Sequence, residues 1–117
     1  MGKLSTHVLD VTQGKPGAGV AISLYEVVAG FRTLVKHVHT NADGRCDAPL
    51  LDGAEMRAGQ FELVFGASDY FARQGMALPT PRFIDEVVIA FGMADPEQNY
   101  HVPLVVSPWS YSTYRGS

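Results

Sequence analysis

The chain has 117 residues, of which 46% are hydrophobic and 18% charged, and its net charge is −3. This length fits a single domain, residues 1–117, while the scattered basic residues and the lack of an apolar run of ~20 residues exclude nucleic acid and membrane as partners. One cysteine, Cys46, precludes an internal disulfide and favours a reducing compartment, so we expect a cytoplasmic protein, with export by way of a removed leader left open.

The first half of the chain consists of short runs with the two-residue period of β-strands. Such runs cover residues 4–11, 20–25 and 32–40, and turn residues separate them. The turn at 41–44 ends in Gly44, which readily adopts the positive φ that tight turns require. These runs predict three strands.

The second half continues the pattern, with one helix. Strands are predicted over 60–65, 83–93, 100–106 and 109–115. Ser68 and Gly75 favour a helix of about two turns between them, as N-cap and C-cap. Pro103 predicts that its strand is an edge or carries a bulge, because proline cannot donate to a ladder.

Seven or eight short strands with one short α-helix predict an all-β fold, a two-sheet β-sandwich. Periodicity predicts nothing about chemistry. That question depends on the titratable and nucleophilic side chains.

Four histidines are the first candidates, and each taken alone is most often structural. His37 and His39 share one strand face and could hold a metal, but no cluster with ligand spacing accompanies them, so no metal site is predicted. Cys46 follows Arg45, whose charge could activate the thiol, although an inert residue after a turn is the favoured interpretation. No nucleophile elbow and no phosphate loop are present.

The C-terminal tail, residues 107–117, is unusually aromatic for a chain end. Aromatic side chains bury large areas, so we expect Trp109, Tyr111 and Tyr114 to anchor the tail by packing. Gly116 lets the backbone approach a ligand closely, and Ser117 then offers a hydroxyl and a carboxylate. The alternative is a plain final strand.

Several stretches together resemble the 5-hydroxyisourate hydrolases, or transthyretin-related proteins. They are residues 4–10, 14–16, 40–51, 61–65, 69–71, 91–96, 100–108 and 111–117. They cover nearly the whole chain, and the terminal Tyr-Arg-Gly-Ser is the most specific of them.

The resemblance implies a transthyretin-like sandwich of two four-stranded sheets and a homotetramer, a dimer of dimers with the sites in its channel. It implies catalytic roles for His7, Arg45 and His101. Tyr114 and Ser117 are implied to bind substrate in the same pocket. No cofactor or metal is implied.

The implied reaction is the hydrolysis of 5-hydroxyisourate, and these residue types suit it. Ring opening at a cyclic amide needs a base for water and a donor for the oxyanion, roles that imidazole and guanidinium can fill. The alternative is a transthyretin-type carrier of small aromatic ligands. We expect such a carrier to lack the His7, Arg45 and His101 set.

Overall fold

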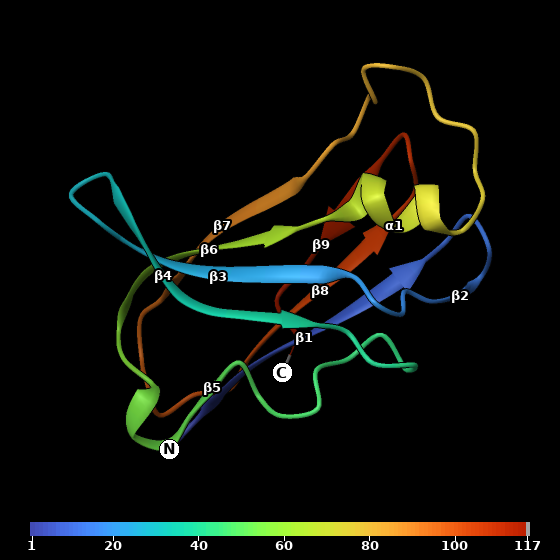
Figure 1. Ribbon diagram of the computed structural model, residues 1–117. Helices are drawn as coiled ribbons and strands as arrows, with labels where there is room; N and C mark the ends of the chain where they lie inside the picture. Colours follow the sequence, from blue (N-terminus) through green and yellow to red (C-terminus); the bar gives the residue numbers. More distant parts are fainter. Residues whose placement is uncertain (117) are drawn as a thin grey trace.

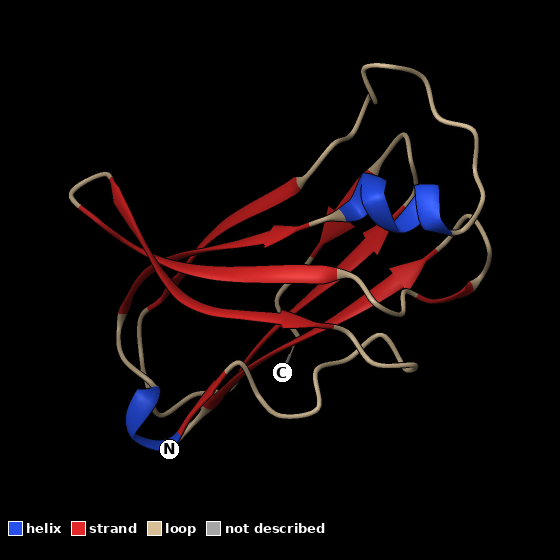
Figure 2. Cartoon of the chain, viewed as in Figure 1, coloured by secondary structure: helices blue, strands red, loops and turns tan. Residues whose placement is uncertain are grey.

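The computed structural model describes residues 1–116 as two β-sheets stacked face to face (Figures 1 and 2). One is a five-stranded sheet of β1 (Lys3–Asp10), β2 (Lys15–Pro16), β5 (Leu51–Asp52), β8 (Tyr100–Val106) and β9 (Tyr111–Thr113). The other is a four-stranded sheet of β3 (Ala21–Val28), β4 (Phe31–His39), β6 (Gly59–Phe65) and β7 (Val87–Met93). The 3-10 helix η1 (Gly53–Glu55) and the helix α1 (Ala67–Arg73) lie at opposite ends of the sandwich. The predicted all-β sandwich with one short α-helix is confirmed.

Alternation along the strands places the core between the sheets. In β1, Leu4, Thr6, Val8 and Asp10 are buried, whereas the residues between them are partly exposed. Leu24, Phe61 and Leu104 are among the fully buried residues, each worth about 1.5–3 kcal/mol of burial. The side chains at Ser5, His7 and Leu9 consequently lie on the outer face of the five-stranded sheet.

The pairing of β1 with β8 joins the two ends of the chain. The strands are parallel, with Ser5 opposite His101 and His7 opposite Pro103. The outer face of β1 thus continues into that of β8 at His101. Sheet order is β2-β1-β8-β9, with β5 also on β1, and β4-β3-β6-β7 in the other sheet. The first sheet therefore has five strands where the resemblance implies four, and two of them, β2 and β5, are only two residues long.

The helix begins earlier than predicted. Its N-cap is Gly66 and its C-cap Gln74, whereas Ser68 lies inside it, buried, with its hydroxyl donating to Asp85 at 2.9 Å. Gly75 follows with φ of 85°, the conformation in which glycine ends a helix. A tertiary hydrogen bond, rather than capping, accounts for this serine.

Several strand predictions were also inexact, and the strand predicted over 109–115 covers only Tyr111–Thr113. Residues 83–86 are not part of β7, which begins at Val87. Pro103 lies in β8, a central strand between β1 and β9, so the predicted edge was wrong. A proline is tolerated there because position 103 lies in a gap, between the β9 ladder at Leu104 to Val106 and the isolated bridge of His101 with Gly116.

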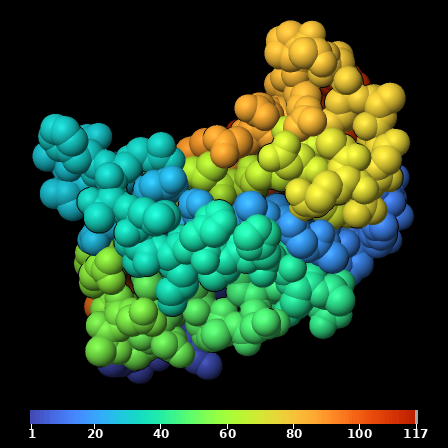
Figure 3. All heavy atoms as spheres, viewed as in Figure 1, coloured from blue at the N-terminus to red at the C-terminus, as the bar shows by residue number. Residues whose placement is uncertain are grey.

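Two segments project from the sandwich (Figure 3). One is the tip of the β3–β4 hairpin, where Ala29 and Gly30 have φ of 52° and 82°, and the other is the connection between α1 and β7.

No helix among residues 1–116 is long and apolar enough to cross a membrane.

Candidate active site

His7, Arg45 and His101 meet on the outer face of the five-stranded sheet. Arg45 forms an isolated antiparallel bridge with His7, and His101 lies in register with Ser5, two residues from His7. The charges of Arg45 and His7 both act on the imidazole of His101. The structure therefore brings together the three residues that the resemblance implied as catalytic.

His101 is fixed from several sides. Its Nδ1 hydrogen-bonds the hydroxyl of Ser5 at 2.9 Å, and its carbonyl accepts the Gly116 N–H at 2.7 Å. A Cβ at position 116 would lie 2.8 Å from Cδ2 of the imidazole, so only glycine fits against this ring. Nε2 is the nitrogen left for other contacts.

The environment of His101 favours its neutral form. Burial, and then the positive charges of Arg45 and His7, lower the pKa of this imidazole below its ordinary value. A neutral imidazole can accept a proton from water.

Arg45 is presented by a loop that docks on β1. The Val8 N–H donates to the carbonyl of Gly44 at 2.8 Å, and the His7 ring, through Nε2, donates to the carbonyl of Asp43 at 2.9 Å. Gly44 has φ of 74°, and a Cβ there would lie 2.4 Å from the carbonyl oxygen of Val8. Glycine is thus required twice at this position, for its φ and for the close approach.

A hollow of about 190 Å³ lies beside this cluster. Ser5 and Arg45 contribute to its wall, and the rest comes from Thr6 and residues 46–49. Cys46, the residue after Arg45, is partly buried. Burial, and then the carboxylate of Asp47, raise the pKa of its thiol. The thiolate is therefore disfavoured, which argues against a nucleophilic Cys46.

Tyr114 lies elsewhere in the single chain. It lines a hollow of about 220 Å³ together with Ile89, Phe91 and Tyr100, where β7 of one sheet faces β8 and the tail of the other. Among residues 1–116 no side-chain hydrogen bond joins Tyr114 to the histidine cluster, and its hollow shares no lining residue with the one beside Arg45. Ser117, the other predicted binding residue, lies outside the described residues.

The tail is held differently from what its sequence predicts. Trp109, Tyr111 and Tyr114 are 57%, 48% and 60% exposed in the single chain. The anchors are polar: Thr113 donates to the carbonyl of Pro103 at 2.8 Å, and β9 pairs with β8. Arg115 donates to Gln98 and to the Asn99 carbonyl, and its guanidinium stacks 4.3 Å from the Tyr100 ring centre.

The other two histidines lie on the four-stranded sheet. His37 is exposed and hydrogen-bonds Ser23 at 2.8 Å, with its ring 5.2 Å from that of His39. Within residues 1–116, no three His, Cys, Asp or Glu side chains are grouped as metal ligands. These two histidines serve below as controls.

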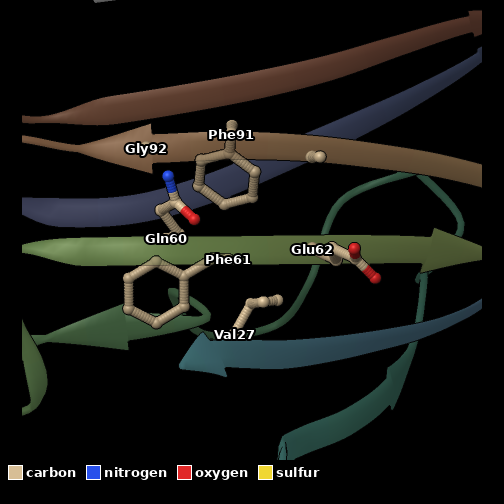
Figure 4. Close-up of a pocket in the computed structure, with 7 residues that line it drawn as sticks. Val27, Gln60, Phe61, Glu62, Phe91 and Gly92 are labelled. Atoms are coloured by element: carbon tan, nitrogen blue, oxygen red, sulfur yellow. The ribbon is translucent and has the colours of Figure 1, made fainter. Parts of the chain in front are cut away.

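A hollow of about 280 Å³ lies on the same sheet (Figure 4). The stacked rings of Phe61 and Phe91 and the side chains of Gln60 and Glu62 line it. It holds neither a histidine nor an arginine, so it lacks the acid–base groups of the cluster described above.

Sequence reasoning missed the contributions of Ser5 and Asn41. Ser5 lies two residues before His7, and period-two alternation could have placed both on one face. Its contact with His101 spans 96 residues and depends on the β1–β8 pairing. Asn41 holds the loop that carries Arg45, through hydrogen bonds described below.

The chain is similar in sequence and fold to known proteins. A model of the HIUase/Transthyretin family matches residues 4–116. A 5-hydroxyisourate hydrolase of Mesorhizobium japonicum is 60% identical over 116 residues, covering 99% of this chain and 93% of that protein. The structure of Klebsiella pneumoniae 5-hydroxyisourate hydrolase superposes with a TM-score of 0.82 at 33% identity, over all of both chains. Sea bream transthyretin in complex with thyroxine superposes with a TM-score of 0.86 at 25% identity, over 97% of this chain and 94% of that one.

Proposed function

The chain belongs to the HIUase/Transthyretin family, and on that premise we propose that it hydrolyses 5-hydroxyisourate in urate degradation. The ring opens at a cyclic amide C–N bond to give 2-oxo-4-hydroxy-4-carboxy-5-ureidoimidazoline. The observation that carries this proposal is the meeting of His7, Arg45 and His101 on one sheet face. The names of the Mesorhizobium and Klebsiella relatives support the same substrate.

The proposed reaction needs only water and these side chains. A neutral imidazole takes a proton from water while the water oxygen attacks the ring carbonyl carbon. The guanidinium of Arg45 stabilises the negative charge that develops on the carbonyl oxygen. As the C–N bond breaks, the departing nitrogen recovers the proton from the imidazolium. The hydroxyl group of the water thus ends on the carbonyl carbon and its proton on the nitrogen, and the enzyme returns to its starting state.

We further propose that the working form is a homotetramer, a dimer of dimers whose channel contains the site. The exposed aromatic side chains of the tail support it, because large exposed apolar residues gathered together mark interfaces. The binding roles of Tyr114 and Ser117 belong to that assembly. A monomer found by light scattering at micromolar concentration would contradict the proposed shared channel.

The transthyretin-type carrier is not favoured. Sea bream transthyretin shares the fold, but fold does not determine function, and the outer face here carries two histidines and an arginine. Those groups suit proton transfer rather than simple binding of an aromatic ligand.

The test is direct assay of ring opening. Mixing the protein with freshly prepared 5-hydroxyisourate and following ultraviolet absorbance is expected to show rapid loss of substrate. The variants His7→Asn, Arg45→Gln and His101→Asn are expected to lose most of this activity. The variants His37→Gln and His39→Gln, on the other sheet, are expected to keep it. A wild-type protein without activity above the spontaneous rate contradicts the proposal.

A further inference from the structure

The loop between β4 and β5 forms a hydrogen bond with the ring of His7 through the carbonyl of Asp43. We infer that Asn41 is a positioning residue: by holding this loop it keeps the His7 proton on Nε2, so that any proton taken up in catalysis goes to Nδ1. This inference rests on the proposed function for its catalytic meaning. Its structural part concerns the tautomer of one imidazole.

The hydrogen bond between His7 and Asp43 has one possible direction. Nε2 of His7 lies 2.9 Å from the carbonyl oxygen of Asp43. A backbone carbonyl only accepts hydrogen bonds, so Nε2 must carry the hydrogen. In the neutral imidazole the other nitrogen, Nδ1, then holds the lone pair. The opposite tautomer would place two lone pairs face to face and lose the bond.

Asn41 fixes the position of that carbonyl. Its side-chain oxygen accepts the N–H of Asp43 at 2.9 Å and that of Arg45 at 3.2 Å. Its side-chain nitrogen donates to the carboxylate of Asp47 at 3.0 Å. The backbone of Asn41 also closes the loop, donating to the Arg45 carbonyl at 2.7 Å and accepting from Gly44 at 2.9 Å. One side chain thus binds the residues on both sides of Gly44.

The loop so held is pressed against β1. Gly44 accepts the N–H of Val8, the residue that follows His7, so loop and strand have a common register. The bridge between His7 and Arg45 belongs to the same contact. Releasing the loop would therefore free the His7 ring and displace the guanidinium together. The hydrogen bonds of Asn41 go to the loop backbone and to Asp47, and none goes to the ring or the guanidinium, so it acts through the backbone.

The tautomer can be read directly by NMR. Protein labelled with 15N in its histidine rings, in a His37→Gln/His39→Gln background, leaves only His7 and His101 to assign. In its neutral form, the wild-type His7 is expected to show a protonated Nε2 and an unprotonated Nδ1. Asn41→Ala is expected to give a mixture of tautomers. The double variant Asn41→Asp/Asp47→Asn keeps the accepting oxygen and places an amide donor opposite it in place of the Asp47 carboxylate, so it is expected to restore the single tautomer.

Kinetics give a second measurement. Asn41→Ala is expected to lower kcat roughly tenfold while KM changes by less than about twofold, because a misplaced base affects the transition state more than ground-state binding. Asn41→Gln places the amide one methylene too far from the backbone N–H groups and is expected to behave as Asn41→Ala. It replaces Asn41→Ala should that variant not fold.

The outcomes separate the two proposals. A wild-type His7 with its proton on Nδ1, or a folded Asn41→Ala or Asn41→Gln with an unchanged tautomer, overturns the inference even if the enzyme is active. A wild-type protein that shows the expected tautomer and no hydrolysis instead contradicts the proposed function and leaves the positioning role of Asn41 supported.

Discussion

Gly116 lies against the imidazole of His101, where a Cβ would come 2.8 Å from Cδ2 and 3.1 Å from Cβ of the histidine. The last described residue of the chain therefore supports one wall of the histidine cluster. This contact gives a physical reason for glycine in the terminal Tyr-Arg-Gly-Ser, namely the space that His101 occupies.

Replacing Gly116 by alanine should displace the His101 ring. We expect kcat/KM to fall about tenfold or more, which corresponds to about 1.4 kcal/mol of transition-state stabilisation. Gly66→Ala is the matched control, because a Cβ there meets only ordinary contacts of 3.5 Å and longer. Equal activity in the two variants would show that the His101 ring tolerates movement.

Deleting residues 116 and 117 should remove both the contact with His101 and the proposed binding role of Ser117. We expect kcat/KM to fall about tenfold or more while the fold and the oligomeric state are unchanged, since β9 and the contacts of Arg115 remain. Steady-state kinetics, circular dichroism and light scattering check the three statements. A truncated enzyme with full activity would limit the tail to a structural role.

Replacing Arg45 by glutamine should raise the pKa of His101. The lost positive charge no longer disfavours the imidazolium, but burial, the main cause of the low pKa, remains. The pKa of His101 should therefore rise and yet stay below its ordinary value of about 6.5 in an NMR titration. If catalysis requires a neutral His101, its lowered pKa keeps the enzyme active as the pH falls. In the wild type, kcat/KM should then decline only at a pH below the one at which an unperturbed histidine becomes protonated. A lower pKa in the variant would contradict the assigned proximity.

Replacing Tyr70 by phenylalanine should destabilise the fold. Tyr70 is buried and donates to the buried carboxylate of Asp10 at 2.8 Å, and the loss of a donor to a buried charge costs about 1–3 kcal/mol. Urea unfolding at fixed protein concentration measures this free energy. Tyr25→Phe is the control, because Tyr25 is only partly buried. A change within about 0.5 kcal/mol of the control would mean that water replaces the hydroxyl.

The strands and the sandwich could be predicted from the sequence because apolar alternation records which face of each strand is buried. Ser68 was misassigned because capping preference is local, whereas its hydrogen bond with Asp85 is tertiary. Pro103 was misplaced because a proline removes one hydrogen bond of a ladder but does not prevent its strand from being central. Here β9 is short and does not pair with position 103.

The candidate site could not be predicted from periodicity at all. His7 and His101 meet only through the parallel pairing of β1 with β8, which no local pattern encodes. The resemblance to 5-hydroxyisourate hydrolases supplied the residues, and the family match confirms the resemblance itself. In the aromatic tail a sequence pattern was instead misleading. Its composition predicts burial, yet Trp109 and Tyr114 lie on the surface of the single chain.

The β1–β8 pairing also bears on protein synthesis. His7 is synthesised well before His101, and the bond from Ser5 to His101 spans 96 residues. Contacts so distant in sequence form slowly, because the intervening chain must first be ordered. A nascent chain still lacking β8 can form the hairpin of β3 and β4 but not the histidine cluster. Enzymatic activity should therefore appear only after β8 has emerged from the ribosome and paired with β1, which makes activity a sensitive measure of complete folding.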